Sequence, residues 1–123
     1  MTTFDMLPWH DAVLLGVRLD RRASRRKDEV VLEVEWPDGV QEEVRILDAY
    51  HADLSLNFGV VGGETIRQGN VSDTGRELDA VRQKWLRLGV DLGDLRVFRV
   101  TTNSTASEIR VFARAFTTAP LSP

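Results

Sequence analysis

The chain has 123 residues, the length of a single domain, and its 42% hydrophobic and 28% charged residues are ordinary for a globular protein. It contains no cysteine, which excludes disulfides, a thiol nucleophile and cysteine-ligated zinc or iron–sulfur sites. No apolar run approaches the roughly 20 residues of a transmembrane helix. The first residues also lack the charged and apolar regions of a signal peptide. Together these features predict a single-domain cytoplasmic protein with no membrane partner.

The charges are segregated along the chain, although the net charge is only −3. Residues 1–27 sum to +3, residues 28–79 to −10 and residues 80–123 to +4. A balance this mild does not indicate a nucleic-acid partner. Two interpretations stay open. The segments neutralise each other across neighbouring strands, or the acidic segment forms a face that meets a basic partner.

Alternation of apolar and polar residues predicts four strands in the first half of the chain, over 13–19, 30–36, 40–46 and 50–58. The basic run Arg21–Lys27 between the first two strands is typical of an exposed loop, because it holds no aromatic residue of the kind that stacks on bases. Trp36-Pro37-Asp38-Gly39 predicts a tight hairpin, since proline presets φ and glycine accepts positive φ.

The second half predicts one helix between strands. Residues 64–71 form a short fifth strand. Thr74 to Glu77 matches the capping box, in which the threonine caps the helix and the glutamate reaches back. Apolar side chains then recur at helical spacing over 75–88 and stop before Gly89, so we expect Trp85 to pack on the sheet. Strands over 95–100 and 109–116 follow.

The expected order is therefore five strands, a helix and two strands, with short connections that make neighbouring strands antiparallel. This pattern predicts an α+β fold: a mainly antiparallel β-sheet of six to seven strands with one amphipathic helix packed on one face. Residues 1–116 form the single domain, and residues 117–123 are expected to be a flexible C-terminal tail.

Catalytic chemistry has few candidate residues. The two histidines are His10, next to Asp11 before the first strand, and His51 on the polar face of the fourth strand. No H-E-x-x-H motif, nucleophile elbow or phosphate-binding glycine loop occurs. We therefore expect no enzyme, no metal and no cofactor. The alternative is a small-molecule-binding domain or minor hydrolase that uses His10, Asp11 and His51 around a pocket.

Several short motifs occur along the chain in a characteristic order. They are Trp9-His10-Asp11-Ala12-Val13 running into Leu19-Asp20-Arg21, Glu35-Trp36-Pro37-Asp38-Gly39, Asn57-Phe58-Gly59-Val60-Val61, Lys84-Trp85 with Leu88-Gly89-Val90-Asp91-Leu92, and Thr102-Asn103-Ser104-Thr105. Over most of residues 9–116 this order resembles the YxiG-like family of small bacterial proteins. The opening His-Asp-Ala strand is also similar to immunity proteins of polymorphic toxin systems.

The resemblance implies a binding role like that of an immunity protein, only through its association with these families. It supplies no catalytic residue. The basic run at 21–27 departs from the family pattern and argues against a uniformly acidic inhibitor of a basic nuclease. The sequence thus predicts a non-enzymatic protein-binding domain, in particular an immunity protein that neutralises a bacterial toxin. Its expected partner is a toxin domain or other protein, and a homodimer formed through sheet edges is a further alternative. The expected partner-binding residues, on a polar sheet face, are Glu33, Glu35, Glu43, His51 and Asp53.

Overall fold

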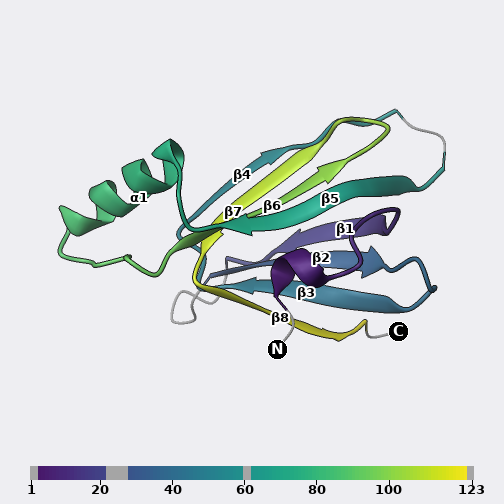
Figure 1. Cartoon of the computed structure of the whole chain (residues 1–123), viewed down its shortest axis with the longest axis horizontal. Helices are drawn as coiled ribbons and strands as arrows, with labels where there is room; N and C mark the ends of the chain where they lie inside the picture. Colours follow the sequence, from purple (N-terminus) through teal and green to yellow (C-terminus); the bar gives the residue numbers. More distant parts are fainter. Residues whose placement is uncertain (1–2, 22–27, 60–61, 122–123) are drawn as a thin grey trace.

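The fold is an antiparallel eight-stranded open sheet with one α-helix, which confirms the predicted α+β class (Figure 1). The computed structural model describes residues 3–21, 28–59 and 62–121. In chain order the elements are the short 3₁₀ helix η1 (Phe4–Met6), β1 (Val13–Leu19), β2 (Glu29–Glu35), β3 (Gln41–Leu47), β4 (His51–Ser55), β5 (Glu64–Ser72), α1 (Arg76–Leu86), β6 (Arg96–Thr102), β7 (Glu108–Ala113) and β8 (Ala115–Pro120). The strand order across the sheet is β4-β7-β6-β5-β1-β2-β3-β8, so β4 and β8 are the two edges.

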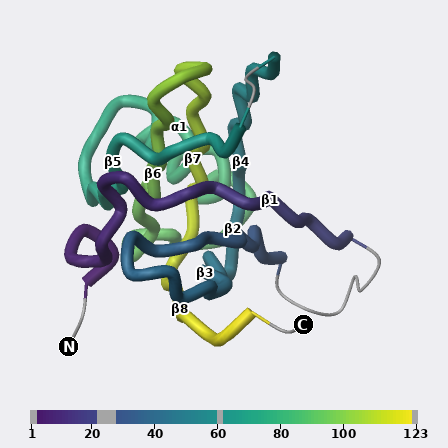
Figure 2. Tube along the Cα trace, turned by 90° about the vertical axis from the view of Figure 1, so that its right-hand side faces the viewer, coloured from purple at the N-terminus to yellow at the C-terminus, as the bar shows by residue number. Residues whose placement is uncertain are grey.

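The sheet is divided into two halves at the junction between β1 and β5. Only two residue pairs, Val13 with Thr65 and Leu14 with Glu64, join these strands. The upper half in Figure 1 contains β4, β7, β6 and β5, and the lower half contains β1, β2, β3 and β8. Figure 2 shows the same halves from the side. β8 lies at the bottom of the lower half, and β4 lies at the right of the upper half. The β-rich chain therefore wraps around a shared interior.

The main core lies between the two halves and follows directly from the period-two alternation. Its buried side chains come from β2 and β3 on one side and from β5, β6 and β7 on the other: Val30, Leu32, Val34, Val44, Ile46, Ile66, Phe98, Val100, Ile109 and Val111. Phe4 of η1 and Trp9 close one end of this core, and their rings lie 4.8 Å apart. Each such side chain contributes roughly 1.5–3 kcal/mol on burial.

Helix α1 lies at one end of the upper half and has a small core of its own (Figure 1). Leu78 is buried there with Phe112 of β7, and Trp85 packs edge-on against Tyr50 with the ring centroids 5.1 Å apart. The predicted capping box is wrong. Gly75, with φ of 141°, takes the N-cap position, and no side chain caps the helix. Because the helix starts one residue later than predicted, Thr74 lies outside the cap.

The C-terminal part of the chain differs most from the sequence prediction. The single strand expected over 109–116 is two strands, β7 and β8, which belong to different halves of the sheet and are separated by Arg114. The tail expected to fray from Thr117 instead pairs with β3 through Pro120, so that prediction is wrong for residues 117–120. The fourth strand ends at Ser55 rather than at residue 58. The fifth strand is confirmed and extends to Ser72.

Candidate functional site

Three of the expected partner-binding residues lie on the outer face of the β1–β2–β3 half. Val30, Leu32 and Val34 of β2 point into the core, so Glu33 and Glu35 point away from it. Glu33 lies directly beside Glu43 of β3 in the strand register. This outer face, with Glu29, Glu33, Glu35, Glu43, Arg18 and Arg45, is called the acidic face below.

The acidic face is held together by ion pairs. Glu43 is only 8% exposed, because two arginines close over its carboxylate: Arg45 Nη2 at 2.8 Å and Arg18 Nη2 at 3.2 Å. Arg18 also pairs with Glu33 at 3.4 Å, and Arg45 with Glu29 at 2.8 Å. Arg18 belongs to the basic first segment and Glu33 and Glu43 to the acidic one, so neutralisation between the segments, one of the two interpretations of the charge pattern, is confirmed for these three residues. Among the described residues of this face, four carboxylates nevertheless face two guanidinium groups.

The other two expected residues, His51 and Asp53, lie on β4 in the other half of the sheet. Asp53 accepts a hydrogen bond from Arg110 of β7 at 2.5 Å, and Arg110 also bonds Glu77 of α1. The hydrogen bond to Glu77 is the main reason that the pKa of Arg110 is raised above its ordinary value. The His51 ring packs edge-on against Phe112, 5.3 Å between centroids. Because the core separates the outer faces of the two halves, the expectation of one polar face holding all five residues is wrong.

The alternative pocket is not assembled either. His10 is exposed, and its Nδ1 lies 3.3 Å from the Arg67 carbonyl oxygen of β5 and its Nε2 3.5 Å from Asp11. His51 stands on β4, three strands across the sheet. At about 4.8 Å per strand, the path along the sheet from β4 to β5, the strand that His10 contacts, is roughly 14 Å. The structure does not bring His10 and Asp11 to His51.

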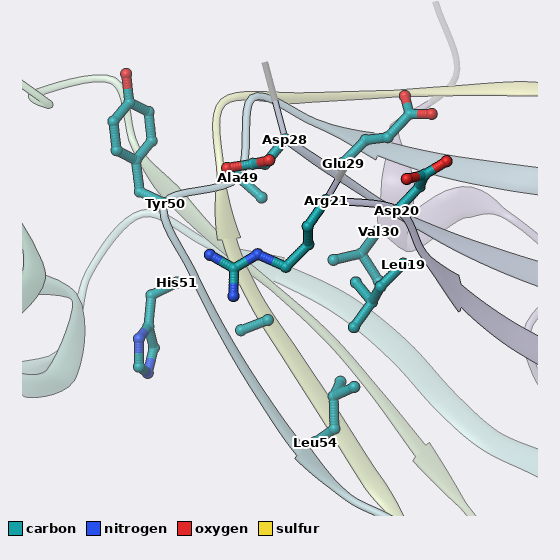
Figure 3. A pocket seen from close by; sticks show the side chains of 11 residues that line it. Leu19, Asp20, Arg21, Asp28, Glu29, Val30, Ala49, Tyr50, His51 and Leu54 are labelled. Atoms are coloured by element: carbon teal, nitrogen blue, oxygen red, sulfur yellow. The ribbon is translucent and has the colours of Figure 1, made fainter. Parts of the chain in front are cut away.

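One cleft of about 360 Å³ opens between the ends of β1 and β2 and the strand β4 (Figure 3). Figure 3 shows the guanidinium of Arg21 extending toward the chain at Tyr50 and His51. Asp28 and Glu29 line the β2 side, and neither His10 nor Asp11 contributes to it. In the described part of the chain, no group of three or more histidine, aspartate or glutamate side chains is placed to hold a metal ion. Apart from Arg21, the predicted basic loop lies outside the described residues.

A network of hydroxyl groups fixes the loop that follows β4. The Asn57 backbone N–H donates to Ser107 Oγ at 2.9 Å, and the Asn57 side-chain amide donates to the Thr105 carbonyl at 2.8 Å. Thr105 donates to Glu64 Oε1 through both its N–H and its hydroxyl, each at 3.1 Å. Burial raises the pKa of Glu64, but hydrogen bonds from Thr102 and Thr105 outweigh that effect, so the pKa lies below its ordinary value. We call this network the Asn57 clamp.

An exposed apolar stripe continues from β4, and its exposure was not predicted from the sequence. Leu54, Leu56 and Phe58 alternate as the apolar face of a strand should, which predicts that all three are buried. Leu54 is half-buried, but Leu56 is 37% and Phe58 86% exposed. The alternation was therefore detectable, but the point where the stripe leaves the core was not.

Comparison of this chain with family models, curated proteins and solved structures gives no match. The resemblance to the YxiG-like family accordingly stays a prediction from motif order. No helix in the part of the chain that the structure describes is long and apolar enough to cross a membrane.

Proposed function

We propose that this domain is a binding protein that docks a basic surface of another protein on its acidic face, as an immunity protein does when it neutralises a toxin. The observation that carries the proposal is the excess of carboxylates that is left on this face after Arg18 and Arg45 have been paired. Glu35 contributes to it, since its side-chain partner among the described residues is the neutral amide of Gln41 at 3.0 Å.

The geometry suits recognition because the carboxylates stand on paired strands. Glu33, Glu35 and Glu43 project from β2 and β3, which pair along their whole length. The ion pairs to Arg18 and Arg45 restrict the side chains further, so binding would order few groups anew. A negative surface of this kind steers a basic partner and opposes an acidic one.

The enzymatic alternative has less support. It requires His10, Asp11 and His51 around one pocket, and these residues lie three strands apart. Binding needs only the surface that is present.

The test starts with capture of the tagged protein's partner from its own host, followed by reconstitution of the complex from purified proteins. Titration calorimetry then compares the wild type with the double variant Glu33→Lys/Glu35→Lys. We expect at least a roughly tenfold weaker complex, which corresponds to about 1.4 kcal/mol, with a thermal unfolding midpoint close to that of the wild type.

The matched control is Asp73→Lys/Asp79→Lys, which makes the same charge change near α1, where both residues are exposed. This control variant should bind the partner with an affinity within about threefold of the wild-type value, since distant surface charges are screened by salt. Equal losses in the two double variants would contradict the assignment of the acidic face. A stoichiometric partner that is itself acidic would contradict the proposed electrostatics.

A further inference from the structure

Strand β4 is an edge of the sheet, and its side chains are unusually exposed. Among the described strands it pairs with β7 alone, and four of its five residues are exposed. The cleft in Figure 3 lies beside it, with Ala52 and Leu54 lining one side and Leu19 the other. In the described residues, the free side of β4 therefore borders an open cleft rather than a packed interior.

The protections that usually keep a sheet edge from pairing are weak on β4. The opposite edge, β8, ends in Pro120, which lacks a backbone donor. Asp53 is the only charged residue among His51–Ser55, and Arg110 already neutralises it. The continuation of the strand adds apolar surface, since Leu56 and the 86% exposed Phe58 follow Leu54 at alternate positions.

The Asn57 clamp holds this continuation in place. The backbone between Leu56 and Phe58 is tied to Ser107 and Thr105 by the two hydrogen bonds from Asn57. An exposed aromatic residue on a fixed backbone costs little conformational entropy when it is buried in an interface. The stripe is thus prepared for a contact that the described residues of the single chain do not make.

We propose that a second copy of this chain pairs with the free edge of β4, antiparallel about a twofold axis at Leu54. In this register Leu54 lies opposite Leu54 of the second copy, and Ala52 lies opposite Leu56. On the other face Asp53 lies opposite Ser55. A shift that placed the axis at Asp53 would set two aspartates against each other, which is unfavourable. The edge sequence is therefore self-complementary in this pairing, and the symmetry makes the contact a closed dimer.

This inference does not depend on the proposed function, because the acidic face lies on β2 and β3 in the other half of the sheet. A failure of one proposal leaves the other to its own experiment.

Sedimentation velocity on the full chain, at about 1–200 μM, tests the dimer. We expect the wild type to dimerise and the variant Leu56→Asp/Phe58→Asp to raise the dissociation constant at least about 100-fold, because both side chains are lost from the interface. The control Leu88→Asp changes another exposed leucine, which is 66% exposed in the turn just after α1, and should not alter the dimer. A wild type that stays monomeric at the highest concentration would overturn the proposal. Equal effects of the two aspartate variants would also overturn it.

Disulfide cross-linking of introduced cysteines tests the register separately. The natural chain has no cysteine that could form other disulfides. At the twofold axis the two Cα atoms are about 5 Å apart, within reach of a disulfide, whereas at position 52 they are roughly 14 Å apart. Mild oxidation should therefore cross-link Leu54→Cys but not Ala52→Cys. Faster cross-linking at position 52 would refute the register, and folding of both variants is checked by circular dichroism.

Discussion

Replacing Gly69 with alanine should destabilise the fold through a clash with the ring of Trp9. A Cβ atom at Gly69 would lie 2.6 Å from three ring atoms of Trp9, far inside van der Waals contact. The ring cannot move aside easily. Its Nε1 donates to the Phe4 carbonyl at 2.7 Å, and it packs edge-on against Trp36 with 5.1 Å between the centroids.

The expected magnitude follows from two opposing effects. Gly69 lies in β5 opposite Val100 and does not have a positive φ, so alanine alone would stabilise the strand by about 0.5–1 kcal/mol. Overpacking of a buried site costs about 1–3 kcal/mol, and the fixed ring puts this case at the upper end. The net loss is therefore about 2 kcal/mol, or roughly 8 °C in Tm for a domain of this size.

Urea unfolding followed by tryptophan fluorescence measures this loss. Gly16→Ala is the matched control, because its Cβ would meet, at 2.8 Å, only the far end of the Glu33 side chain, which can rotate aside at the cost of its 3.4 Å pair with Arg18. The free energy of unfolding should change by less than about 0.5 kcal/mol. Shrinking the ring with Trp9→Phe should recover at least about 1 kcal/mol of the loss in the double variant. A Gly69→Ala protein as stable as the wild type would refute the argument.

Two further predictions concern charged groups that hold loops together. Glu64→Gln should cost about 1–2 kcal/mol at pH 7. The amide oxygen would accept the two hydrogen bonds from Thr105 without the charge that strengthens them, and the amide NH2 would replace Oε2, which is buried without a hydrogen-bond partner among the described residues. The native pKa of Glu64 is lowered, so this stabilisation is complete above the unfolded value of 4.5 and is lost as the pH falls through the native value. Urea midpoints at pH 7 and pH 3 should therefore show a gap between wild type and variant that narrows in acid, and a constant gap would count against the prediction. Arg114→Lys should cost about 1–2 kcal/mol, because one ammonium cannot replace the bonds to Asp48 at 3.1 Å and Asp94 at 3.0 Å. Thermal unfolding should give Arg114→Lys a lower midpoint than the exposed control Arg87→Lys. Equal midpoints would show that the turn between β7 and β8 does not need the guanidinium of Arg114.

Local features of the fold were predictable from the sequence because each depends on neighbouring residues. The alternation of β2 appears unchanged as a strand with a buried inner face. The hairpin at Trp36 also forms as expected: Gly39 has φ of 90°, and the Trp36 N–H donates to the Val40 carbonyl at 2.9 Å. Residues a few positions apart carry all the information that these elements require.

The arrangement of the candidate site was decided by contacts between distant residues. Arg114 lies within an unbroken alternating run, and its bonds to distant residues, among them Asp48 and Asp94, mark the corner that divides this run into β7 and β8. Glu43 is paired with Arg18, 25 residues away, as well as with the nearby Arg45, and Asp53 is paired with Arg110, 57 residues away. The division of the acidic residues between two faces therefore depends on contacts between distant residues.

The exposure of Phe58 has the same origin. Whether an apolar stripe stays buried depends on which element covers it, and covering elements come from elsewhere in the chain. The alternation in residues 50–58 determined which side chains share a face. The tertiary structure decided where that face leaves the core, because β4 ends at Ser55 and Asn57 is bound to Ser107, 50 residues further along.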